Sequence, residues 1–153
     1  PAKRGVINSI YIDTESLSVH NADLQKMYAE VKANEQMWEE YKCEDAEYVI
    51  TAFGTVARIA KSAIDQLREE GIKVGLVRPI TVWPFPYDAV KKVACADGVK
   101  AVLDVELNEG QMLEDVKLAI NGAKPVDFFG HLGSEMPTTD EIVAKIKSMK
   151  EGM

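Results

Sequence analysis

The densest group of polar side chains in the 153-residue sequence lies in Val105–Asp115, "VELNEGQMLED". Glu106 and Glu109 could act as general bases or ligands, and Asn108 and Gln111 could supply amide groups. A carboxylate at a strand end beside a helix N-terminus could bind a substrate or a metal ion. The same residues could equally cap the helix, with the acids in solvent. The residues alone leave both interpretations open.

Two further positions carry weaker chemical signals. Gly54 follows a strand and precedes a helix, whose first N–H groups could bind an anion. No three-glycine or P-loop pattern surrounds it, so a tight strand–helix turn is favoured. His131 lies between glycines in "FFGHLGSEMP", with no nucleophile or second ligand near it in the sequence, which is typical of a loop residue.

The segment 78–86, "RPITVWPFP", combines three prolines with Trp83 and Phe85. It contains neither a PxxP nor a PPxY motif, so a ligand for a proline-binding domain is disfavoured. Proline fixes φ and ends a strand, while the two aromatic residues supply large apolar area. We predict a loop that ends a strand and whose aromatics are buried within the domain or against a partner.

The composition excludes several classes of protein. A net charge of −7 argues against general binding to nucleic acid or anionic membranes, and no apolar run is long enough to span a bilayer. Cys43 and Cys95 form no CxxC pair or Cys/His cluster, so a zinc or iron–sulfur centre is not expected in this chain. No nucleophile-elbow motif supports a hydrolase.

The apolar periodicity alternates between strands and helices. Strands are predicted at 46–53, 72–77, 99–105 and 125–129; helices are predicted at 21–42, 55–70, 87–96, 110–120 and 139–150, the last with a capping box at Thr138 and Glu141. Such βαβ units predict an α/β three-layer sandwich with a mostly parallel sheet of four or five strands. Ligands approach the carboxyl ends of such strands, where the segments described above should lie.

Three segments together resemble a known family: "ITAFGTVARIAKSAIDQLREEGIKVGLVRPITVWPFP", "ELNEGQMLEDVKLAING" and "FFGHLGSEMPTTDEI". They resemble the C-terminal part of the alpha subunit of 2-oxoacid:ferredoxin oxidoreductases, the 2-oxoisovalerate (branched-chain) type in particular. The resemblance covers about residues 21–150 and implies the fold of the transketolase C-terminal domain. Residues 1–20 are then an extended lead-in from a preceding domain. The start of the chain without methionine is typical of a cut inside a longer protein, and equally of a removed tag.

Enzymes of this family use thiamine diphosphate and magnesium to decarboxylate a 2-oxoacid, reduce ferredoxin through iron–sulfur clusters and form an acyl-CoA. The resemblance implies that these cofactors bind in other domains or subunits of a cytoplasmic complex, and that this chain alone is inactive. It would then be an assembly domain, in contact with the preceding domain and the other subunits. The candidate contact residues are Trp83, Phe85, Glu106, Asn108, Gln111 and His131.

Two alternatives stay open. The first is a small-molecule site for coenzyme A or the substrate at the carboxyl edge of the sheet, with Gly54, Glu106 and Gln111 as ligands. The second is a stand-alone protein-binding module.

Overall fold

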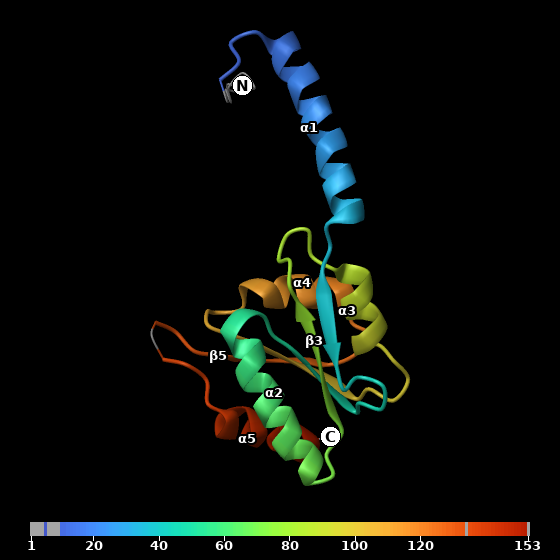
Figure 1. Ribbon diagram of the computed structural model, residues 1–153, viewed down its shortest axis with the longest axis vertical. Helices are drawn as coiled ribbons and strands as arrows, with labels where there is room; N and C mark the ends of the chain where they lie inside the picture. Colours follow the sequence, from blue (N-terminus) through green and yellow to red (C-terminus); the bar gives the residue numbers. More distant parts are fainter. Residues whose placement is uncertain (1–4, 6–9, 134, 153) are drawn as a thin grey trace. The chain divides into compact units, whose positions relative to one another are not determined.

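The computed structural model describes residues 5, 10–133 and 135–152, and the chain divides into two compact units, residues 1–35 and 36–153. The first unit contains helix α1 (Thr14–Asn34), drawn in blue in Figure 1. The Asp13 carboxylate caps this helix by accepting the N–H groups of Glu15 and Ser16. None of the helix residues is buried, because their apolar stripe is weak.

The prediction of a helix over 21–42 was wrong at both ends. The helix begins at Thr14 because Asp13 caps it, so residues 14–20 are helical and not extended. Its last predicted turn is instead strand β1, which pairs with a neighbouring strand. Residues 1–4 and 6–9 of the predicted lead-in lie outside the described residues, and a domain boundary at residue 21 stays a prediction.

The second unit is built on a five-stranded sheet in the order β1-β3-β2-β4-β5. The strands are β1 (Trp38–Tyr41), β2 (Tyr48–Thr51), β3 (Val74–Pro79), β4 (Ala101–Glu106) and β5 (Val126–Gly130). β1 is antiparallel to β3, and the other pairs are parallel. This confirms the predicted α/β class and its mostly parallel sheet, with β1 as the strand that the periodicity missed.

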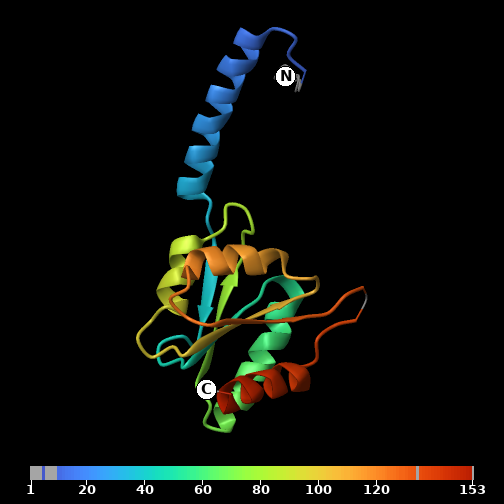
Figure 2. The same ribbon diagram turned by 180° about the vertical axis from the view of Figure 1, so that it is seen from behind.

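Helices cover both faces of the sheet, as the two views in Figures 1 and 2 show. On one face α2 packs against α5, and on the other α3 packs against α4. Their bounds are α2 (Gly54–Glu69), α3 (Tyr87–Ala94), α4 (Gln111–Ile120) and α5 (Thr139–Glu151). Each face has its own hydrophobic cluster, since the strands alternate their side chains between the two. The predicted capping box of Thr138 and Glu141 is present at α5.

The strand order creates a switch point between β2 and β4. In the sheet, β3 lies next to β2 and β5 lies next to β4, on opposite sides of the β2–β4 pair. The chain passes from β2 through α2 to β3, and from β4 through α4 to β5. Adjacent parallel strands that lead to opposite faces leave a crevice outside their carboxyl ends. We call the end of the sheet where β2, β3, β4 and β5 finish the carboxyl edge.

Candidate functional site at the carboxyl edge

Glu106 is the last residue of β4, and its carboxylate caps the first turn of α4. Its side chain is 1% exposed, and its carboxylate accepts the backbone N–H groups of Met112 and Leu113, each at 3.0 Å. The Asn108 side chain donates a third hydrogen bond to the same carboxylate, also at 3.0 Å. Of the two interpretations that the sequence left open, the structure has the cap geometry, although with a buried acid in place of a solvated one.

Asn108 orders the turn between β4 and α4. Its side-chain oxygen accepts the N–H groups of Gly110 and Gln111 at 2.7 and 2.8 Å. Gly110 has φ of 96°, a conformation that favours glycine, so the turn depends on it. Gln111 begins α4 and keeps an exposed side chain.

A cavity of about 370 Å³ lies beside this turn and has a mainly apolar wall. Its lining comes from the loops after β2 and β3, the end of β4 and the start of α4: Phe53, Val82, Phe85, Glu106, Gln111, Met112 and Asp115. The structure thus brings together three of the predicted residues, Phe85, Glu106 and Gln111. Asp115 accepts a hydrogen bond from the Tyr87 hydroxyl, which raises the pKa of Tyr87 to about 12.

The two aromatic residues of the "WPFP" loop point in different directions. Phe85 is 3% exposed and packs in the cluster between the sheet and the α3–α4 face, whereas Trp83 is 54% exposed. The loop is fixed to the start of the unit, since the N–H groups of Ile80 and Thr81 both donate to the Met37 carbonyl. Phe85 is therefore an anchor inside the domain, and only Trp83 of this pair offers area to a partner.

Gly54 and His131 do not line the cavity. Gly54 has φ of 57° and open space at its Cβ position, so its role in the strand–helix turn is conformational. His131 lies on the loop after β5, where its two ring nitrogens are 3.7 and 3.5 Å from carboxylate oxygens of Glu135 and Glu141. The His131 ring also packs edge to face against the Phe129 ring.

The sequence reading missed Asp104, which is fully buried on β4. The Thr51 hydroxyl donates a hydrogen bond to Asp104 Oδ1 at 2.5 Å. Thr51 and Asp104 lie directly opposite each other in the β2–β4 strand pair. Burial, and next the neighbouring Glu106, raises the pKa of Asp104 to about 8. The sequence does contain a sign of this buried acid: an aspartate inside the apolar run "AVLDVE", with a second acid two positions later.

Exposed large apolar side chains gather at the carboxyl edge. Among the described residues of the second unit they are Met37, Trp38, Ile80, Val82, Trp83, Tyr87, Leu107, Leu132 and Met136, with Leu118 on α4 lying elsewhere. All but Met37 and Trp38 lie on or directly after the loops that follow β3, β4 and β5. Met37 and Trp38 lie at the same edge because β1 is antiparallel to β3, so that Trp38, the first residue of β1, pairs with Pro79, the last residue of β3. We call these nine side chains the apolar edge surface.

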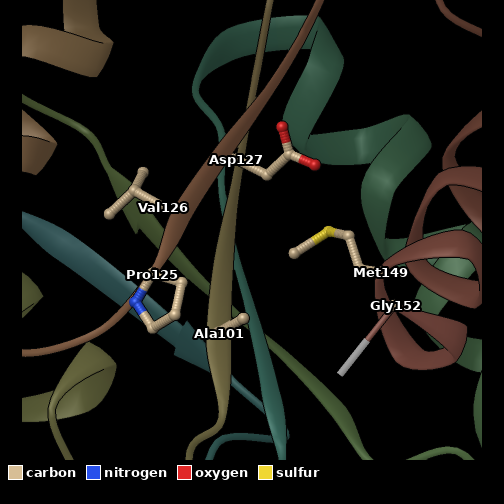
Figure 3. A pocket seen from close by; sticks show the side chains of 6 residues that line it. All are labelled: Ala101, Pro125, Val126, Asp127, Met149 and Gly152. Carbon is tan, nitrogen blue, oxygen red and sulfur yellow. The ribbon is translucent and has the colours of Figure 1, made fainter.

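A second cavity, of about 350 Å³, lies near the amino ends of β4 and β5 (Figure 3). Met149 extends from α5 toward the strands there, and Ala101, Pro125 and Val126 supply further apolar lining. The Asp127 carboxylate at its rim is 2.7 Å from Lys145 Nζ, so its charge is paired. This cavity contains none of the predicted candidate residues.

Magnesium and iron–sulfur clusters, which the sequence resemblance implies for the whole enzyme, need grouped carboxylate or cysteine ligands. Within residues 5, 10–133 and 135–152, no three His, Cys, Asp or Glu side chains are grouped so as to hold a metal ion. The Cys43 thiol donates to the Leu76 carbonyl, and burial raises its pKa to about 11, so it stays neutral. Two cysteines also fall short of the four thiolates that an iron–sulfur cluster requires. No helix in the described part is both long and apolar enough for a transmembrane span.

Comparison with known proteins gives the family. Residues 46–142 match the family model of pyruvate:ferredoxin oxidoreductase core domain II. The chain is 40% identical over 146 residues to the ketoisovalerate oxidoreductase subunit VorB of Methanothermobacter marburgensis, which covers 95% of this chain and 41% of that subunit. The chain thus spans about two fifths of the relative that it matches.

Two solved structures show the same fold at low sequence identity. One is the 2-oxoglutarate:ferredoxin oxidoreductase of Magnetococcus marinus, with 2-oxoglutarate, coenzyme A and succinyl-CoA bound. It matches with a TM-score of 0.71 and 20% identity over 90% of this chain and 24% of that chain. The other is a split-gene transketolase, with a TM-score of 0.58 and 20% identity over 69% of this chain and 38% of that one. The predicted transketolase-like fold is confirmed, and the chain belongs to the pyruvate:ferredoxin oxidoreductase core domain II family of the 2-oxoacid:ferredoxin oxidoreductases.

Proposed function

We propose that this chain is the non-catalytic C-terminal assembly domain of the alpha subunit of a thiamine-diphosphate-dependent 2-oxoacid:ferredoxin oxidoreductase. The observation that carries the proposal is the apolar edge surface, which gathers nine of the ten exposed large apolar side chains in the described part of the second unit. Exposed apolar patches of this kind mark protein contacts. The similarity to a ketoisovalerate oxidoreductase subunit supports 2-oxoisovalerate as the substrate of the assembled enzyme.

The polar residues at this edge support a structural role. Glu106 and Asn108 already form hydrogen bonds to backbone groups at the start of α4, so they have little capacity left for a substrate. In the proposed enzyme, thiamine diphosphate, magnesium and the iron–sulfur clusters bind in other domains or subunits. Ferredoxin and coenzyme A are partners of the whole cytoplasmic enzyme, whereas this domain contacts the preceding domain and the other subunits.

The alternative of a coenzyme A or substrate site at this edge is not favoured. Of the three proposed ligands, Gly54 does not line the cavity, and Glu106 is almost completely buried. The charged residues of the cavity wall are two acids, Glu106 and Asp115, with no basic residue among them. Such a wall repels the phosphates of coenzyme A.

The test is assembly of the parent alpha subunit with its partner subunits. In the double variant Val82→Ser/Trp83→Ser we expect loss of the complex on size-exclusion chromatography, while the melting temperature of the isolated chain stays within a few degrees of wild type. Leu118→Ser, an exposed leucine outside the apolar edge surface, is the matched control and should assemble normally. Normal assembly of the double variant would contradict the proposal.

A second measurement addresses the non-catalytic part of the proposal. Isothermal titration of the 153-residue chain with thiamine diphosphate and magnesium should show no binding. A micromolar dissociation constant would mean that the chain contributes a cofactor site of its own.

A further inference from the structure

Asp104 and Glu106 are two acids that lie side by side in the interior of the second unit. They are two residues apart on β4, so their side chains project from the same face of the strand. Asp104 is 0% exposed and Glu106 is 1% exposed. Neither forms an ion pair with a lysine, arginine or histidine within the described residues.

The hydrogen-bond partners of the two acids differ. Glu106 receives three N–H donors, from Asn108, Met112 and Leu113, which suit a charged carboxylate. Asp104 receives a single hydroxyl donor, Thr51, on Oδ1. Its other oxygen, Oδ2, is buried without a hydrogen-bond partner. A proton on Oδ2 turns that oxygen into a donor, with the neighbouring Glu106 as its acceptor.

The surrounding charged groups leave the acids without a neutralising partner. On α4, Lys117 favours an ionised Asp104 through space, but its side chain is exposed. Asp115, also on α4, is engaged with the Tyr87 hydroxyl of α3, and β2 contributes only the uncharged Thr51. Two adjacent carboxylates in a poorly hydrated interior do not both stay charged without a cation, so one of them holds a proton. Asp104 accepts fewer hydrogen bonds than Glu106, so we assign the proton to Asp104.

We propose that Asp104 and Glu106 form a proton-dependent latch, which holds the first turn of α4 against the carboxyl edge of the sheet. With the proton in place, hydrogen bonds run from Thr51 on β2 through Asp104 and Glu106 to the N–H groups of α4. Loss of the proton leaves two like charges in contact beneath that turn. The turn also supplies Gln111 and Met112 to the cavity wall, so the latch sets the shape of the cavity. This inference does not depend on the proposed function.

The direction of the pH effect follows from the pKa of Asp104, which burial raises from 3.8 to about 8. The stabilisation from the protonated side chain is complete below about pH 4 and is lost as the pH rises toward 8. Between those values unfolding releases one proton, so the unfolding equilibrium constant rises up to about tenfold per pH unit. Above the pKa in the folded state the slope disappears.

The experiment compares the 153-residue chain with Asp104→Asn, which keeps the shape of the side chain and cannot ionise. Denaturant unfolding at pH 5.5, 7.0 and 8.5 should give a wild-type unfolding constant that rises relative to Asp104→Asn by up to about tenfold per unit as far as pH 8. The control Asp115→Asn, at an acid on the wall of the carboxyl-edge cavity that Glu106 also lines, should follow the wild type. Equal pH slopes for wild type and Asp104→Asn would overturn the latch.

A second readout needs only the wild-type chain and decides the question even if Asp104→Asn fails to fold. The side-chain ¹³C carboxyl resonance of Asp104 should titrate with a midpoint near pH 8. Amide hydrogen exchange of Met112 and Leu113, corrected for the intrinsic rate, should accelerate over the same range. A titration midpoint near pH 4 would overturn the proposal. Exchange rates of Met112 and Leu113 that stay constant while Asp104 titrates would also overturn it.

Discussion

The two ends of the parallel sheet have opposite surfaces. At the amino end, charged side chains pair with each other: the exposed Lys100 with Glu47 at 2.5 Å, and the partly buried Arg68 with the exposed Asp45 at 2.7 Å. At the carboxyl edge, the acids Asp104 and Glu106 are buried, and nine large apolar side chains are exposed. A sheet can thus face water at one end while its other end carries the features of an interface, and substitutions should have unequal effects at the two ends.

The largest difference should come from removing the buried cap of α4. Glu106→Ala leaves two backbone N–H groups without their acceptor in the interior, and we expect a loss of about 2–3 kcal/mol in the free energy of unfolding. Urea denaturation measures this loss. Glu109→Ala, at an exposed neighbour, should stay within about 0.5 kcal/mol of wild type. Equal losses in both variants would remove the distinction between buried and solvated acids at this edge.

The same substitution at glycines of the two ends sharpens the comparison. A Cβ atom at Gly130, where β5 ends, would lie 2.5 Å from the Asn108 carbonyl oxygen, whereas at Gly98, before β4, the nearest atom is 3.7 Å away. Gly130→Ala should therefore destabilise the unit by about 1–3 kcal/mol. Gly98→Ala should cause no loss beyond about 0.5 kcal/mol. Thermal unfolding of the two variants in parallel checks this, and the reverse order would contradict the tight packing at the carboxyl edge.

The smallest effect should come from the ion pairs at the amino end. Lys100→Ala breaks the pair with Glu47, in which both side chains are substantially exposed. Because solvent and salt screen such pairs, we expect no change in the denaturation midpoint beyond measurement error, at low or high salt. A salt-sensitive loss as large as that of Gly130→Ala would show that the amino end is not simply a solvated surface.

Much of the fold follows from periodicity, and the exceptions have local causes. The buried apolar runs and the stripe on α2 predict the four parallel strands and the helices around them. β1 was missed because "WEEY" is only four residues long, follows a helical segment and becomes a strand by pairing with β3. The start of α1 was missed because the capping by Asp13 outweighs the weak apolar stripe that follows it.

The site was less predictable because its geometry depends on distant partners. The sequence placed Glu106, Asn108 and Gln111 at a strand end but did not show whether the carboxylate faces solvent or the first turn of α4. Asp104 is held by Thr51, which lies 53 positions earlier in the chain. For Trp83 and Phe85, only the fold shows that one is exposed and the other buried.

The attachment of Met37 to the β3–α3 loop has a mechanical consequence. Its carbonyl accepts from Ile80 and Thr81, and its N–H donates to the Thr81 hydroxyl at 3.0 Å. Tension on the polypeptide that precedes Met37 would load these hydrogen bonds first and would then unzip β1 from β3, since β1 is a short strand at the border of the sheet. A pull from upstream would therefore disturb the loop that carries Trp83 before it reaches the hydrophobic core.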